Sequence, residues 1–173
     1  MNAHSFLGYS ATDVHATLDR LSATGFKPTL ALLFASKVAL DLPEITNAFA
    51  KYGVDVFGVS SASEIMYDGT SDDSVFDESC AGLLLDVPRS RYSVGMFSGG
   101  DIPSFSLGET AGTWASETFE RPSLLIGSSG MTADGEQLTK GILSKFSNPI
   151  PIFGGLAGDD LQLRETLVFT RND

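Results

Sequence analysis

Apolar and polar segments follow one another in the same order in two parts of the chain. In each part a short apolar run opens at a Pro-X-Leu sequence, Pro28-Thr29-Leu30 or Pro122-Ser123-Leu124, and a helical segment follows. A second apolar run then ends at a Phe-Gly pair, Phe57-Gly58 or Phe153-Gly154. Continuous apolar runs of this length are typical of strands buried on both faces. The pattern predicts one domain over residues 1–173, with an internal repeat over about 10–98 and 107–173.

Three helices are predicted from N-cap signals. Ser10, Asp41 and Asp134 each precede a segment in which apolar residues recur at helical spacing, and a short polar side chain at this position accepts a free backbone N–H. These helices are expected over 11–24, after Asp41 as far as Tyr52, and after Asp134 as far as Phe146. A weaker apolar periodicity predicts a further helix over 108–120.

Strands are predicted over 30–34, 54–59, 81–87, 92–97, 124–126, 150–153 and 166–170. We expect 81–87 and 92–97 to form an antiparallel pair around Pro88-Arg89-Ser90. Turns are expected at Asp68-Gly69 and Asp72-Asp73 within the acidic segment that follows Ser60. The predicted fold class is α/β, a layered mixed, mainly parallel sheet built from two helix-strand-helix-strand units with extra antiparallel strands. The strand order is left open.

Composition narrows the range of functions. The 173 residues are 42% hydrophobic, which suffices for a substantial core, and the formal net charge is −11 without a basic cluster, which argues against nucleic-acid binding. Cys80 is the only cysteine and is expected to be a buried thiol. Because the sequence shows neither a secretory signal nor an apolar run of about 20 residues, we expect a cytoplasmic protein that does not enter the membrane.

Three of the predicted strands end in loops of small and polar residues. In α/β sheets, ligands bind beyond the carboxyl ends of strands, where glycine permits close approach, serine donates or accepts, and a carboxylate can bind a cationic group. We therefore expect a site for a small polar ligand, such as an amino-acid-like molecule. The predicted contacts are Ser60, Ser61, Ser63, Glu64, Ser128, Ser129, Gly154, Gly155 and Asp159.

The same loops carry a family resemblance. Leu-Leu-Phe-Ala-Ser at 32–36, Phe-Gly-Val-Ser-Ser-Ala-Ser-Glu-Ile at 57–65 and Phe-Gly-Gly-Leu-Ala-Gly-Asp-Asp at 153–160 resemble the N-terminal part of the FIST domain of bacterial signal-transduction proteins, over about residues 28–173. The resemblance implies a non-catalytic sensory domain for amino acids or related compounds. It also implies a C-terminal FIST domain or a downstream signalling module as partner, whereas this chain stops at Asp173.

Two other functions remain open. Gly58-Val59-Ser60-Ser61-Ala62 is close to the nucleophile elbow of serine hydrolases, but Ala62 replaces its last glycine, and His4 and His15 both precede the serine. A hydrolase is therefore the weaker alternative, and no catalytic residue, metal or cofactor is assigned. The stronger alternative is an interaction module, in which an unpaired sheet edge joins a second copy of the chain as a homodimer.

Overall fold

A five-stranded mixed sheet forms the centre of the first part of the protein. The computed structural model describes residues 2–66 and 75–171. In the order β1 (Asn2–Gly8), β6 (Cys80–Asp86), β2 (Leu30–Ala35), β3 (Asp55–Ser60) and β9 (Val168–Thr170), the neighbours β2 and β3 are parallel and the other pairs are antiparallel. The loops that follow β2 and β3 therefore leave the sheet at the same edge.

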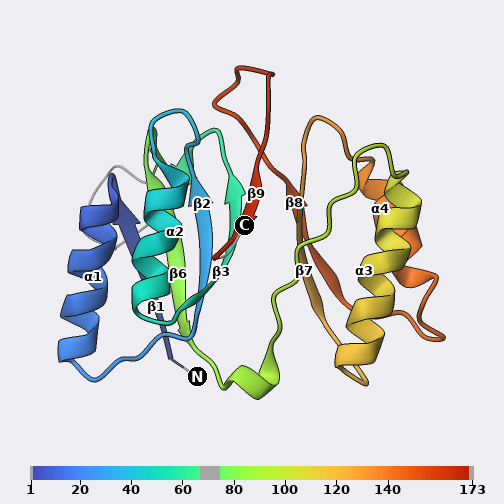
Figure 1. Ribbon diagram of the computed structural model, residues 1–173, viewed down its shortest axis with the longest axis horizontal. Coiled ribbons are helices and arrows are strands. Elements are labelled where there is room, and N and C mark those ends of the chain that lie inside the picture. Colours follow the sequence, from blue (N-terminus) through green and yellow to red (C-terminus); the bar gives the residue numbers. More distant parts are fainter. Residues whose placement is uncertain (1, 67–74, 172–173) are drawn as a thin grey trace.

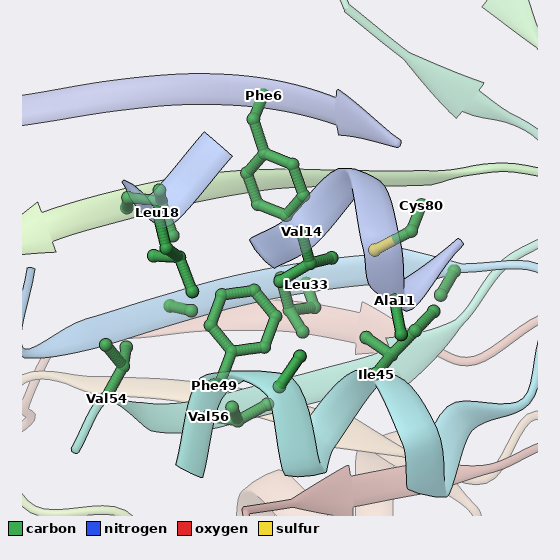
Figure 2. Close-up of a cluster of buried hydrophobic side chains, with 14 of the residues drawn as sticks. Phe6, Ala11, Val14, Leu18, Leu33, Ile45, Phe49, Val54, Val56 and Cys80 are labelled. Carbon is green, nitrogen blue, oxygen red and sulfur yellow. The ribbon is translucent and has the colours of Figure 1, made fainter. Parts of the chain in front are cut away.

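Helices α1 (Ala11–Ala23) and α2 (Leu42–Lys51) lie on one face of this sheet (Figure 1). Both begin at the predicted caps: the Ser10 hydroxyl accepts the N–H of Asp13 at 3.2 Å, and the Asp41 carboxylate accepts that of Glu44 at 3.0 Å. The main hydrophobic core lies between these helices and the sheet. Figure 2 shows several of its members, Phe6, Val14, Leu18, Leu33, Ile45, Phe49, Val56 and Cys80, directed toward one another.

The second part repeats the helix-strand-helix-strand order with α3 (Ser104–Thr118), β7 (Leu124–Ser128), α4 (Gly135–Leu143) and β8 (Ile152–Leu156). Strands β7 and β8 are parallel, as β2 and β3 are, and α3 and α4 lie on their outer side (Figure 1). The helix α4 begins at its predicted cap, since the Asp134 carboxylate accepts the N–H of Gln137 at 3.0 Å. The two strand pairs meet where Gly127 faces Val59 and Phe57 of β3.

The predicted fold class, a layered mixed α/β architecture, is confirmed, but the role of residues 92–97 is not. This segment is not a strand and does not pair with 81–87. The reason is that β6 already has β1 on one side and β2 on the other, so neither edge of β6 remains for a hairpin partner. A short 3-10 helix, η1 (Arg89–Arg91), leads the chain away from the sheet toward the second part instead.

Two further elements differ from the expectation. Strand β1 was not predicted, because its residues show little apolar alternation and only Phe6 and Gly8 are buried in it. Helix α3 begins at Ser104 rather than Gly108, without a side-chain cap that could have marked its start.

Short strands β4 (Glu64–Ile65) and β5 (Val75–Phe76) pair with each other, and the predicted turns at Asp68-Gly69 and Asp72-Asp73 lie outside the described residues. In the described parts of the chain, no helix has the length and apolar character that crossing a membrane requires.

Candidate functional site

The three predicted loops come together at one edge of the protein, through backbone hydrogen bonds between distant segments. Gly158 donates its N–H to the carbonyl of Ser60 at the end of β3, and Ala157 donates to Ser128 at the end of β7, both at 2.8 Å. The N–H of Gly130 reaches the Thr166 hydroxyl at 2.9 Å. We call this meeting point of residues 57–64, 126–130 and 153–167 the loop junction.

Ser60 lies at the centre of the loop junction and is 1% exposed. Its hydroxyl donates to the Gly158 carbonyl at 2.5 Å and accepts the N–H of Leu167 at 2.8 Å. Its backbone N–H donates to the Leu167 carbonyl, also at 2.8 Å. Because this serine is enclosed and its hydroxyl is occupied by two backbone groups, it joins the first sheet to the 157–167 segment and does not present a free hydroxyl.

Glu64 is also inside the protein, with 1% of its surface exposed. The Ser61 hydroxyl donates to one carboxylate oxygen at 2.6 Å, while the hydroxyl and N–H of Ser79 donate to the other at 2.5 and 3.3 Å. A buried carboxylate must be satisfied in this way, since its desolvation is costly. Burial, and secondarily the Glu64 charge, raise the pKa of the neighbouring Cys80 thiol to about 12. The expected buried thiol at Cys80 is confirmed.

Asp159 organises the segment that follows β8. Its carboxylate accepts three backbone N–H groups, from Leu163 at 3.0 Å, Arg164 at 2.6 Å and Glu165 at 3.2 Å. The hydrogen bond from Arg164, helped by those from Leu163 and Glu165 and opposed by desolvation, lowers the pKa of Asp159. These bonds hold a loop in which Asp160, Leu161 and Leu163 all adopt left-handed backbone conformations, which are unfavourable for residues with a side chain.

Gly154 and Gly155 are adjacent in β8 but differ in the space around them. A side chain at Gly154, whose φ is +141°, would overlap the carbonyl of Ile126 in β7. A Cβ at Gly155 would meet no atom within 4 Å. Gly154 is therefore required for the close pairing of β7 with β8, while the backbone at Gly155 is open to an approaching molecule.

The remaining predicted serines differ in whether their hydroxyl groups are available to a ligand. The Ser129 hydroxyl contacts Thr166 at 3.0 Å and accepts the N–H groups of Met131 and Thr132. Ser63 is exposed and donates to Asp77 at 2.8 Å. Ser128 is half-buried at the end of β7, and its hydroxyl has no hydrogen-bond partner among the residues that the structure describes. Of the predicted contacts, Ser128 and Gly155 are the most open to a ligand.

Several residues of the loop junction were not identified from the sequence. Ser36 donates to the Asp160 carboxylate at 3.0 Å, and Lys37 forms an ion pair with Glu165 at 3.1 Å, so the turn after β2 also contacts the 157–167 segment. Thr166 and Leu167 complete the hydrogen bonds of Gly130 and Ser60. Only the placement of Ser36 and Lys37 directly after a predicted strand could have indicated them.

The chemistry of the loop junction does not resemble a nucleophile with its base. Ser60 donates to a carbonyl, and both histidines lie elsewhere: His4 beside Arg20, and His15 beside Lys51 on the surface of α1 and α2. Within the described ranges no three acidic, histidine or cysteine side chains are grouped as a metal site requires. The hydroxyl and backbone groups of the loop junction can donate and accept hydrogen bonds.

One of three comparisons with known proteins gave a match. A family model described as FIST N domain matches residues 29–173, which is most of the chain. Comparisons with curated proteins and with solved structures gave no significant match.

Proposed function

Because this chain belongs to the FIST N domain family, a sensory-domain family of signal transduction, we propose that it is a cytoplasmic, non-catalytic input domain that binds a small polar ligand. The ligand class proposed is amino acids and related small polar molecules. The observation that carries the proposal is the loop junction, where loops from both repeated units meet through direct hydrogen bonds. A molecule bound there contacts both units at once.

The hydrogen bonds within the loop junction support a smaller set of proposed contacts. Ser60, Glu64 and Asp159 satisfy their hydrogen-bonding groups within the protein, so they support the site without touching the ligand. Ser128 and the open backbone at Gly155 are proposed as the contacts, with exposed Ser63 at the rim. Ligand binding would then displace the β7–β8 unit relative to β3. The size of this effect depends on how much more tightly the ligand binds one arrangement of the two than the other. That displacement is the proposed signal to a C-terminal FIST domain or a signalling module.

A thermal-shift screen of amino acids, small carboxylates and nucleotides tests this proposal. A ligand at about one hundred times its dissociation constant stabilises the folded state by about 2.7 kcal/mol, or roughly 5–10 °C in a domain of this size. The variants Ser128→Ala and Gly155→Val should remove that shift while remaining folded, because neither residue makes a required contact. Ser116→Ala on the exposed surface of α3 is the matched control. A shift that survives in both site variants would disprove the proposed site.

A second candidate function, homodimerisation, is supported by a different observation. In the described sheets β8 pairs with β7 alone, and Phe153 lies opposite Leu125 on one face of this pair. Phe153 is 64% exposed and Leu125 is 44% exposed, so the pair presents apolar surface beside an open strand edge. We propose that a second copy of the chain covers this surface. Sedimentation equilibrium should show a dimer that Phe153→Lys converts to monomer, and a wild-type monomer at high concentration would exclude this function.

A further inference from the structure

A cavity lies at the end of the first sheet opposite the loop junction. It begins at Asp55, the first residue of β3, whereas Ser60 at the loop junction is the last, so the two places are about 17 Å apart along the strand. The cavity has a volume of about 340 Å³, within the range of pockets that hold small ligands. The segment after η1, residues 92–96, forms one wall, and Thr170 and Arg171 at the end of β9 form another.

The charges around this cavity are unusual for so acidic a chain. Its charged lining consists of Asp55, Arg89 and Arg171, two guanidinium groups against one carboxylate, although the whole chain has a net charge of −11. Arg89 is occupied on both sides, by the Asp55 carboxylate through Nη1 and by the Gly53 carbonyl through Nη2. Arg171 contacts the other Asp55 oxygen through Nη1 at 3.1 Å. Among the described residues of the lining, two guanidinium groups share one carboxylate, so these three side chains together carry one net positive charge.

This cluster is held in place by the surrounding backbone. The Tyr92 hydroxyl lies 2.7 Å from the carbonyl of Thr29 and 2.8 Å from the Asp55 carboxylate. Burial, and then the hydrogen bond to Asp55, raise the pKa of Tyr92, which therefore remains a neutral donor. Fixed in this way, Asp55 positions the Arg171 guanidinium before any ligand arrives, which lowers the entropic cost of binding.

The 92–96 segment contributes the apolar part of the lining. Val94 and Met96, both half-buried, form an apolar wall next to the charged cluster, whereas the side chain of Val56 lies in the main core. A cavity whose described charged side chains sum to one net positive charge, with hydrocarbon beside them, matches a molecule with a single negative charge and a short apolar chain. A dianion such as phosphate would bring more negative charge than this single net positive charge neutralises, and an inorganic ion would leave the apolar wall uncovered.

We propose that this cavity is a second ligand site, separate from the loop junction, and that it binds small aliphatic carboxylates. The carboxylate pairs with the Arg171 guanidinium, and the hydrocarbon chain lies along Val94 and Met96. The site does not depend on the loop junction or on its ligand. Because β3 runs from one site to the other, occupation of the cavity is in a position to affect Ser60 through the same strand.

The test titrates acetate, butyrate and inorganic phosphate into the full chain at constant ionic strength, followed by backbone amide chemical shifts. We expect butyrate to bind more tightly than acetate, to shift the amides of residues 92–96, and to bind about tenfold more weakly to Arg171→Gln. The variant Arg164→Gln, an exposed arginine of the 157–167 segment, should bind butyrate as the wild type does. The variant Arg171→Lys retains the charge and should bind with intermediate affinity.

Three results would overturn the proposal. Equal butyrate affinity in Arg171→Gln and Arg164→Gln would mean that Arg171 is not the contact. Phosphate binding as tight as butyrate binding would show a general anion effect without use of the apolar wall. Unchanged amide shifts in the wild type at high butyrate concentration would make the charged cluster a purely structural link between η1, β3 and β9. Loss of the loop-junction ligand would leave all these results unchanged.

Discussion

Replacing Ser60 by alanine tests whether the loop junction holds the two repeated units together. The change removes a donor to the Gly158 carbonyl and an acceptor for the Leu167 N–H, both inside the protein, since Ser60 is 1% exposed. Each backbone group left without a partner costs about 1–3 kcal/mol. We therefore expect Ser60→Ala to lower the free energy of unfolding by about 2–6 kcal/mol, a large part of the total of about 5–15 kcal/mol for a typical domain.

Urea unfolding measures this loss. Far-UV circular dichroism follows the whole chain, and the fluorescence of Trp114, the only tryptophan, follows α3 in the second unit. The matched control is Ser63→Ala in the same loop, which removes an exposed hydroxyl and should cost less than about 0.5 kcal/mol. If the two variants unfold at the same urea concentration, the hydrogen bonds of Ser60 do not hold the units together. If the loss of stability is confirmed, ligand binding to Ser60→Ala must be measured under conditions in which this variant is folded.

Three further predictions concern the interior. The lowered pKa of Asp159 means that its charge stabilises the protein above its unfolded pKa of about 4, and that this contribution disappears as the pH falls through the folded pKa. Asp159→Asn should therefore have a lower free energy of unfolding than the wild type at pH 7. Denaturation measured at a series of falling pH values should show this difference narrowing, and a constant difference would mean that the carboxylate is not ionised. The Cys80 thiol, with a pKa of about 12, should react with iodoacetamide at pH 8 roughly 100-fold more slowly in the folded protein than in urea, and similar rates would contradict its burial. A side chain at Gly141 would overlap the Phe105 carbonyl where α4 contacts α3, so Gly141→Ala should destabilise by about 1–3 kcal/mol, whereas Gly135→Ala, at an uncrowded helix start, should stabilise by about 0.5 kcal/mol in the same thermal melts.

The sequence was sufficient for the elements whose signals are local. The caps at Ser10, Asp41 and Asp134 identified three helix starts, because a cap is a contact between residues three positions apart and depends little on the rest of the fold. The apolar runs identified β2, β3, β7 and β8, and their order along the chain predicted an internal repeat. The ends of these strands also identified the loops that meet at the loop junction.

Strand partners and the roles of the site residues were decided by tertiary structure alone. The alternation in 92–97 is compatible with a strand, but β6 has no free edge, and this depends on β1, almost eighty residues earlier in the chain. Ser60, Glu64 and Asp159 have the polar groups that a ligand site needs, yet Gly158, Ser79 and the 163–165 backbone occupy them. The chemistry of a side chain is set by its residue type, whereas its availability to a ligand depends on which distant groups the fold places beside it. For that reason the loops could be predicted from the sequence, while the one serine among their described residues with a free hydroxyl could not.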